Sequence, residues 1–357
     1  MDLAFTDEQQ FLRESVRGTI EREAPLARVR EWVLGERVEH ADALAMAVRQ
    51  GWTGIGIADE CGGQGGGVLE LSILAQELGR GAVPADGLYA TLLTEIALVR
   101  CSDVAARGSL ESFATGEAFA ALAAPGGLPL DAAPAGGELA LVLGAQHADT
   151  IFAWDGGSLE LYDRASAGVT PRRLVDRTRA FADVSLPGEP RLRLGGLDAE
   201  GMREVAAAAA VMVAADALGA AERMLELTVE YVGQRVQFGV PVGSFQAVKH
   251  STAEMLVGIE GTRAAVQYAA WAVGAEEPGR HVDAWVAKSR ASRVASEVAD
   301  KALFLHGAVG YTWEHDLQLL FKRAKSDSEL FGSAGAYEDR IADSLDLAPA
   351  ERFTLTR

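Results

Sequence analysis

Apolar residues recur at helical spacing along the first third of the chain. The apolar positions of the first run are Phe11, Leu12, Val16 and Ile20. Thr6 followed by Gln9 forms a capping-box pattern just before this run, which predicts that a helix begins there. The same spacing predicts helices over 40–50 and 68–79, the second ending close to Gly79.

Short, mostly apolar runs replace the helical pattern between residues 119 and 198. These runs cover 139–144, 150–154, 158–162 and 180–188. The turn Asp155-Gly156-Gly157 between the second and third runs is typical of a β-hairpin, and the last run ends at a proline, which fits a strand end. We therefore predict a small β domain for this part of the chain.

Helical spacing returns after residue 200. We predict helices over 201–233, from Ser244 to about 273, over 281–304, and over two shorter stretches at 314–330 and 335–346. Ser244 is a suitable N-cap for the second of these helices. The first stretch contains no proline and would be about 50 Å long at 1.5 Å per residue. Long antiparallel helices of this kind form a bundle.

The order of these elements predicts an α+β protein. We expect an N-terminal helical domain (1–118), a shortened middle β domain (119–198) and a C-terminal four-helix bundle domain (199–357). Residues 54–67 are rich in glycine but match no nucleotide-binding pattern. We interpret them as a turn that packs closely against a neighbour, and not as a phosphate-binding loop.

Composition and charge narrow the class of protein. Hydrophobic residues make up 49% of the 357 positions, which allows a large core, and the formal net charge is −18. Such acidity argues against a nucleic-acid-binding protein, which needs a basic face. Cys61 and Cys101 have neither metal-ligand nor CxxC spacing, so we expect reduced structural thiols and no metal site.

No targeting or membrane segment is expected. The N-terminal residues MDLAFTDEQQ have neither the basic nor the apolar region of a signal peptide. The Ala-rich run 205–221 is apolar, but Asp216 interrupts it and charged residues flank it, so a buried helix explains it better than a membrane span. We expect a cytoplasmic protein.

Four segments together resemble the acyl-CoA dehydrogenase family. RVQFGVPVGSFQAVKH (235–250) matches the family's Arg-x-x-Phe-Gly…Phe-Gln motif, and LHGAVGYTWEHDLQLLFKRAK (305–325) matches its His-Gly-x-x-Gly-aromatic-Thr-x-Glu segment. DRTRAFADVSLPG (176–188) and GIGIADECGGQG (54–65) are similar to the strand that leaves its β domain and to its N-terminal glycine turn. The match spans nearly the whole chain, and the two C-terminal motifs are specific.

The resemblance implies an FAD-dependent oxidoreductase that desaturates an acyl-CoA thioester in lipid metabolism, for example in steroid degradation. A carboxylate base would take a proton from Cα while the flavin takes a hydride from Cβ. In family members one subunit holds the flavin ring and the substrate, and its neighbour reaches the ADP half of the FAD across a dimer interface.

The half that would reach a neighbour's FAD is mostly present. Arg235 occupies the position of the family's pyrophosphate-contacting arginine, which a guanidinium suits, although a salt bridge at a helix end would also explain it. The other matching positions are Gln237, Phe238, Gln246, His306 and Gly307. Two positions depart from the family, with Phe304 in place of Gln and Ala308 in place of Gly. Phe304 cannot donate a hydrogen bond, and Ala308 adds a Cβ.

The half that would hold the flavin ring is largely absent. Family members carry a Thr-Glu-x-x-x-Gly-Ser-Asp-type loop and a Lys-x-Trp-x-Thr-type strand, and region 120–152 contains neither. Its Ala, Gly and Pro residues offer few side-chain hydrogen bonds to a flavin. The resemblance therefore implies a degenerate flavin pocket.

Neither standard position of the family's catalytic glutamate holds a carboxylate. The commoner position, about twenty residues past Tyr311, falls on Phe331, and Glu338 lies seven residues further on among charged residues typical of a solvated helix face. The other position falls on Ala209. Candidates for a shifted base are Glu204 and Glu329.

These features favour the non-catalytic subunit of a heteromeric α2β2 acyl-CoA dehydrogenase of the actinobacterial kind. Its partner would be a homologous catalytic subunit, and Arg235 with its neighbours would complete the ADP half of an FAD shared with that subunit. Two alternatives stay open. One is a homo-oligomeric flavoenzyme of the same fold with a relocated base or with monooxygenase or oxidase activity, and the other is a flavin-free scaffold subunit.

Overall fold

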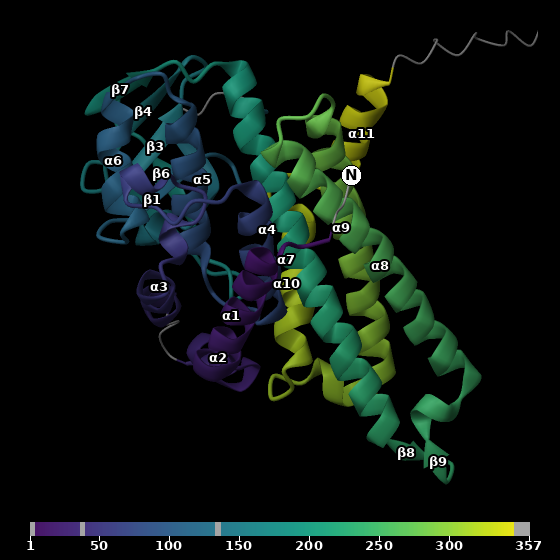
Figure 1. The fold of residues 1–357 in the computed structure, drawn as a ribbon. Coiled ribbons are helices and arrows are strands. Elements are labelled where there is room, and N and C mark those ends of the chain that lie inside the picture. Colours follow the sequence, from purple (N-terminus) through teal and green to yellow (C-terminus); the bar gives the residue numbers. More distant parts are fainter. Residues whose placement is uncertain (1–3, 36–39, 133–136, 346–357) are drawn as a thin grey trace, which may run out of the picture.

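A computed structural model describes residues 4–35, 40–132 and 137–345 of the protein (Figure 1). Helices build the N-terminal part, strands follow in the middle, and long helices form the C-terminal part, so the predicted fold class is confirmed. The domain boundaries at 118 and 198 stay predictions. The expected end of the last helix at residue 346 lies outside the described residues.

The N-terminal part is helical, as the spacing of apolar residues predicts. Its α-helices are α1 (Asp7–Glu23), α2 (Leu26–Leu34), α3 (His40–Arg49), α4 (Val68–Arg80), α5 (Asp86–Arg100) and α6 (Ala105–Ala114). The predicted capping box is present, since the Gln9 N–H donates to the Thr6 hydroxyl at 3.3 Å and the Thr6 N–H donates to the Gln9 side chain at 3.0 Å. Helices α2, α5 and α6 were not predicted. Almost every side chain of α5 is buried, so this helix has no polar face by which its sequence could be recognised as helical.

The glycine-rich segment 54–67 is a closely packed turn, as expected. The Gly56 N–H donates to Gly65 O at 2.8 Å, and the Gly65 N–H donates to Ile57 O at 2.8 Å. A Cβ on Gly63 would lie 2.0 Å from Ile57 O, so no larger residue fits there. These glycines allow backbone segments to touch.

Two sheets make up the β region. Its strands are β1 (Ala120–Ala123), β2 (Glu138–Leu143), β3 (Thr150–Trp154), β4 (Ser158–Asp163), β5 (Gly168–Arg172), β6 (Phe181–Ser185) and β7 (Leu192–Gly195). One sheet has the order β1-β3-β4-β7 and the other β2-β6-β5. The predicted hairpin joins β3 and β4, and Asp155 Oδ1 accepts the N–H groups of Gly157 and Ser158 in its turn.

The C-terminal part is a bundle around α7. Its helices are α7 (Ala199–Gln234), α8 (Gln246–Gly274), α9 (Arg280–His306), α10 (Leu317–Glu329) and α11 (Ala334–Ser344). The prediction that Ser244 caps α8 is wrong, because the N-cap is Phe245 without a side-chain bond. The Ser244 hydroxyl instead donates to Pro241 O at 2.7 Å in the turn that precedes the helix.

Helix α7 lies at the centre of the molecule (Figure 1). It contains a stretch long and apolar enough to cross a membrane, but that stretch is completely buried within the protein, as expected of a core helix. Helix α4 crosses it so closely that a Cβ on Gly79 would lie 2.0 Å from Asp216 O, and one on Gly219 would lie 1.9 Å from Gln76 O. Gly79 therefore serves this crossing, one residue before α4 ends.

Candidate functional site

The residues of the expected ADP site gather at one end of the C-terminal bundle. A hairpin of β8 (Val236–Gln237) and β9 (Val240–Pro241) follows α7 and precedes α8. Helix α9 ends at the same place. Its last residue, His306, stacks its ring on that of Tyr231 near the end of α7, with ring centroids 4.5 Å apart. The structure thus brings together the two sequence motifs that lie about seventy positions apart (Arg235 and His306).

The tip of the hairpin presents an exposed aromatic ring. Phe238 and Gly239 have φ angles of 53° and 82°, as a tight two-residue hairpin turn of the primed type requires. Phenylalanine is strained at positive φ, and the Phe238 side chain is 93% exposed with only the edge of Phe245 beside it. A strained residue that displays a large apolar ring to solvent is typical of a recognition site.

The polar side chains at the hairpin are exposed. Within the described parts of the chain no carboxylate pairs with the Arg235 guanidinium, so the helix-end salt bridge that would otherwise explain this arginine is not formed. Gln237 donates to the neighbouring Val236 O at 2.8 Å, and Gln246 opens α8 as an exposed side chain. An unpaired guanidinium beside amide groups suits phosphate oxygens.

His306 and Gly307 shape the other side of this end. His306 is buried, its Nδ1 lies 2.8 Å from Ala302 O, and burial lowers its pKa. Gly307 turns the chain with a φ of 64°. Phe304, one of the departures from the family pattern, is 81% exposed on α9 and offers only an apolar ring. The residues present therefore fit the ADP half of an FAD in part, through Arg235 above all, with an aromatic surface around it.

The family's base position is buried and fully engaged. Phe331, 3% exposed, has a φ of 55° and donates its N–H to Gly126 O at 2.7 Å. Its own carbonyl accepts the Tyr337 hydroxyl at 2.8 Å, and the next carbonyl, Gly332 O, accepts the Lys288 ammonium at 3.0 Å. The segment that would carry the base thus lies directly against residues 125–130, in the region where the flavin-holding loop was sought.

The carboxylates considered as a shifted base either pair with basic side chains or are exposed to solvent. Burial alone would raise the pKa of Glu204, but the hydrogen bond from Arg280 and the positive charge of its neighbours lower it. Glu329 is the last residue of α10 and is exposed. Glu338 is half-exposed and binds Arg293 and Ser289 on α9, which lowers its pKa to about 2. Ala209 lies buried in α7.

Glu200, Glu204 and His281 form the one group of possible metal ligands among the described residues, with ligand atoms within 4.8 Å of one another. The Arg280 guanidinium already donates to Glu204 at 2.8 Å, and Arg100 lies 4.0 Å from its other oxygen. Positive side chains therefore compensate Glu204, and we assign no metal here.

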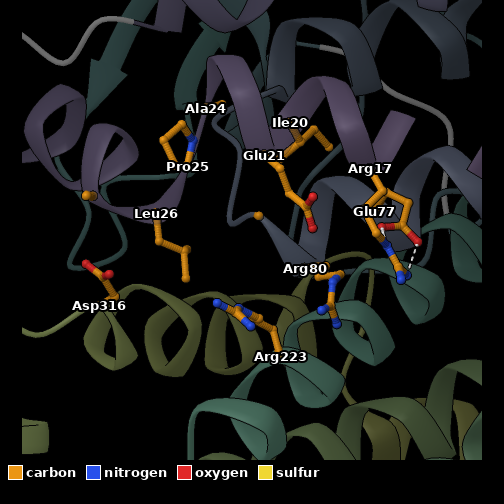
Figure 2. A pocket seen from close by; sticks show the side chains of 12 residues that line it. Arg17, Ile20, Glu21, Ala24, Pro25, Leu26, Glu77, Arg80, Arg223 and Asp316 are labelled. Carbon is orange, nitrogen blue, oxygen red and sulfur yellow. Dashed lines mark hydrogen bonds and ion pairs between the residues drawn. The ribbon is translucent and has the colours of Figure 1, made fainter. Parts of the chain in front are cut away.

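A cleft lies between the N-terminal helices and the bundle, away from the hairpin (Figure 2). It has a volume of about 310 Å³, with Ile20, Pro25 and Leu26 on one side and the side chains of Arg80 and Arg223 opposite. Glu226 binds both arginines, and elsewhere in the lining Arg17 pairs with Glu77. Because these arginines already have carboxylate partners, the cleft carries no ligand assignment.

Sequence reasoning missed a buried group of charges at the centre of the molecule. It consists of Asp86, Arg179, Asp216, Arg323 and Asp327, whose side chains are all 0% exposed. Asp216, which interrupts the Ala-rich run, could have revealed this group from the sequence. We took it as evidence against a membrane span and did not look for its partner. A lone carboxylate within a buried helix requires a cation next to it.

Comparisons with known proteins agree with these features. Residues 6–117 match the acyl-CoA dehydrogenase N-terminal domain, and residues 201–345 match the acyl-CoA dehydrogenase C-terminal domain. The acyl-CoA dehydrogenase IpdE2 of Mycobacterium tuberculosis is 36% identical over 92% of this chain and 94% of its own length.

Solved structures are similar over the same extent. A chain of the ChsE4-ChsE5 complex from Mycobacterium tuberculosis is 26% identical with a TM-score of 0.86, over 98% of this chain and 100% of that chain. A variant of the Tcur3481-Tcur3483 steroid ACAD is 25% identical with a TM-score of 0.84, over 94% of this chain and 97% of that chain. The chain belongs to the acyl-CoA dehydrogenase family.

Proposed function

We propose that this chain is the subunit of a heteromeric, FAD-dependent acyl-CoA dehydrogenase that lacks the catalytic glutamate. In this proposal a homologous catalytic subunit holds the flavin ring and the acyl-CoA, and the Arg235 hairpin of the present chain completes the ADP half of that FAD. The assembly would work in the cytoplasm. Bound FAD would supply the acceptor for the hydride from Cβ of the substrate.

The contact between Phe331 and Gly126 carries this proposal. A base that acts at Cα and a flavin that acts at Cβ must face the acyl group from opposite sides, so the acyl group lies between them. Each reacting contact takes about 3–3.5 Å, so at least about 7 Å must separate the two walls of such a site. Here the corresponding backbones are hydrogen-bonded at 2.7 Å. This close contact, together with the absence of a carboxylate at Phe331, supports the proposal that the chemistry takes place in the partner subunit.

The free guanidinium of Arg235 supports the second half of the proposal. Among the described residues no carboxylate pairs with Arg235, and the nearby Phe238 is strained and exposed. Neither residue contributes visibly to the stability of this chain, so a role in binding explains them better. Phe238 lies at the tip of the β8–β9 hairpin and Arg235 at its base, where α7 ends. The hairpin projects from the bundle, where it can reach a neighbouring subunit (Figure 1). This arrangement favours a flavin-completing subunit over a flavin-free scaffold.

The relatives suggest the class of substrate. A similar solved structure is described as a steroid ACAD, and another is the ChsE4-ChsE5 complex. We propose that the assembly acts on a CoA thioester with a bulky, steroid-like acyl group, and that the partner subunit contributes most of the acyl pocket. The closed contact at Phe331 supports this division, because it leaves this chain no comparable pocket at its own base position.

Flavin content tests the proposal. Co-expression with the partner subunit should give a yellow complex, whereas the chain alone should be colourless. Arg235→Ala should weaken FAD retention by the complex roughly tenfold to a hundredfold, since a hydrogen bond to a charged group contributes about 1.5–3 kcal/mol. Equilibrium dialysis with absorbance at the flavin band measures this loss.

Arg203→Ala is the matched control, because Arg203 lies near the opposite end of the same helix and pairs with Glu200. It should leave flavin content unchanged. Unchanged flavin content and activity in Arg235→Ala would contradict the proposal. A chain that, purified alone, holds stoichiometric FAD and reduces a dye with an acyl-CoA would instead establish the homo-oligomeric flavoenzyme.

A further inference from the structure

The buried group of charges at the centre of the molecule, which we name the ionic cluster, connects all three parts of the chain. Its members are Asp86 on α5, Arg179 just before β6, Asp216 on α7, and Arg323 and Asp327 on α10. All five side chains are 0% exposed. Ionisable groups without water are costly unless they pair directly. Burial raises the pKa of the Asp327 carboxyl, and the positive charge of Arg179 beside it opposes this.

Each member of the cluster pairs directly with at least one other member. Arg179 Nη1 lies 2.7 Å from Asp86 Oδ1, and the Nη2 of the same residue binds Asp327. Arg323 donates two hydrogen bonds to Asp216, from Nε to Oδ1 at 2.9 Å and from Nη2 to Oδ2 at 2.7 Å. The Tyr89 hydroxyl donates to Asp216 at 2.6 Å. Arg179 is therefore the link between α5 in the N-terminal part, the strand β6 and the end of α10.

The ionic cluster lies next to the contact that closes the base position. Asp327 lies in the last turn of α10, four positions before Phe331. Arg179 lies two positions before Phe181, and the ring of Phe181 packs so closely on Gly126 that a Cβ there would lie 2.9 Å from it. The Arg179–Asp327 pair thus joins the end of α10 to the segment before β6, and Phe181 of β6 packs on Gly126, the residue that accepts the hydrogen bond from Phe331.

Further polar contacts hold the same segment from the bundle side. The Lys288 ammonium donates to Asp327 O and Gly332 O, both at 3.0 Å. Arg340 on α11 binds Asp131 at 2.8 Å, which ties the residues after Gly126 to the last helix. Lys288 thus fixes residues 327–332 to α9, and Arg340 fixes Asp131 to α11, so both segments are held in place beside each other.

We propose that the ionic cluster is a latch that holds the end of α10 against the segment before β6. Through Phe331 and Phe181, which both contact Gly126, it holds residues 327–332 against residues 125–131 and so keeps this chain's own flavin and acyl site closed. The closed site is then an actively stabilised state of the fold, and not only a pocket that has lost its polar side chains. The inference rests on the proposed function in one respect, since it takes Phe331 as the position of the absent base.

Hydrogen–deuterium exchange of the full chain tests the latch. The double substitution Arg179→Met with Asp327→Leu removes the pair that joins the end of α10 to the segment before β6. We expect the Phe331 amide to exchange at least about thirtyfold faster, because opening no longer breaks a buried ion pair. Amides in the middle of α8 should keep their exchange rates. A peptide covering 326–333 reports the first and a peptide covering 260–270 the second.

Arg191→Met with Asp163→Leu is the matched control, because it removes an exposed ion pair from the same β region and should leave both rates unchanged. If the double substitution in the cluster prevents folding, Asp327→Asn keeps the shape of the site and should still speed exchange at Phe331 about threefold or more.

An unchanged rate at Phe331 would overturn the latch. Equal acceleration at Phe331 and in α8 would also overturn it, since the cluster would then stabilise the whole fold and not this contact. The test involves no flavin, so it can fail while Arg235→Ala still lowers flavin retention. A normal flavin content in Arg235→Ala with a confirmed latch would reject only the proposed function.

Discussion

At the scale of single residues, burial decides how several side chains ionise. The rings of His40 and His147 lie 5.3 Å apart, with His40 at the start of α3 and His147 between β2 and β3. Burial, and secondarily the neighbouring His40, lowers the pKa of His147 to about 4. Burial also lowers the pKa of His40, although the carboxylate of Asp86 opposes this. Both imidazoles are therefore neutral in the folded protein near neutral pH.

This burial predicts a loss of stability in mild acid. An unfolded chain protonates His147 near pH 6.5, whereas the folded chain does so only near pH 4. The unfolded state therefore binds more protons between these values, and the free energy of unfolding falls as the pH drops from 6.5 towards 4. We expect His147→Gln to remove about 2 kcal/mol of the loss between pH 7 and pH 5.

Urea denaturation at the two pH values measures this difference. His250→Gln is the control, because His250 is exposed on α8 and its substitution should leave the pH dependence as in the wild type. An unchanged pH dependence in His147→Gln would show that this imidazole does not couple folding to protonation.

At the scale of elements, the crossing of α4 and α7 depends on two glycines. Gly79 and Gly219 let the two backbones touch, with Gly79 facing Asp216 O and Gly219 facing Gln76 O. The same crossing places Gln76 where its amide donates to Glu222 on α7. A contact between helix backbones leaves no space for a side chain, so the spacing of the helices follows from these residues.

Gly219→Ala should destabilise the protein by at least about 2 kcal/mol, because the new Cβ would lie 1.9 Å from a backbone oxygen that cannot move freely. Gly233→Ala in the same helix meets nothing within 4 Å and should instead stabilise it by up to about 1 kcal/mol. Chemical denaturation of both variants distinguishes the two effects. Equal changes would mean that helix propensity, and not the crossing, determines the response.

At the scale of the whole molecule, apolar side chains gather uncovered at the hairpin end of the bundle. The exposed large residues there include Val236, Phe238, Val240, Phe245 and Phe304. Uncovered apolar groups close together mark an interaction surface in a protein whose net charge of −18 otherwise favours solubility. This end also carries the free Arg235, as the proposed partner subunit requires.

Phe304→Glu should weaken binding of the catalytic partner at least about tenfold, because a charge would replace an aromatic group in the contact. The free energy of unfolding should hardly change, since the side chain is exposed. Phe11→Glu on α1 is the control with a similarly exposed ring. Isothermal titration with the partner measures both, and an equal effect of the two variants would place the interface elsewhere.

The sequence predicted the elements whose pattern is local. The capping box of α1, the hairpin between β3 and β4, and the long helix around residues 201–233 all follow from neighbouring residues, and the structure confirms them. Helix α5 escaped prediction because it is buried all round, and Ser244 was misjudged because its hydroxyl bonds to the preceding turn. The motif around Arg235 was visible because its residues are contiguous in the sequence.

The sequence by itself determined the fold class, the family resemblance and the absence of a carboxylate at Phe331 and Ala209, because each depends on residue identity or local spacing. Only the tertiary structure decided that Phe331 touches Gly126 and that Arg179 pairs with Asp327, 148 positions away. Contacts between distant segments depend on how helices and strands pack, which no local pattern encodes. The physical closure of the site is therefore a property of the folded molecule.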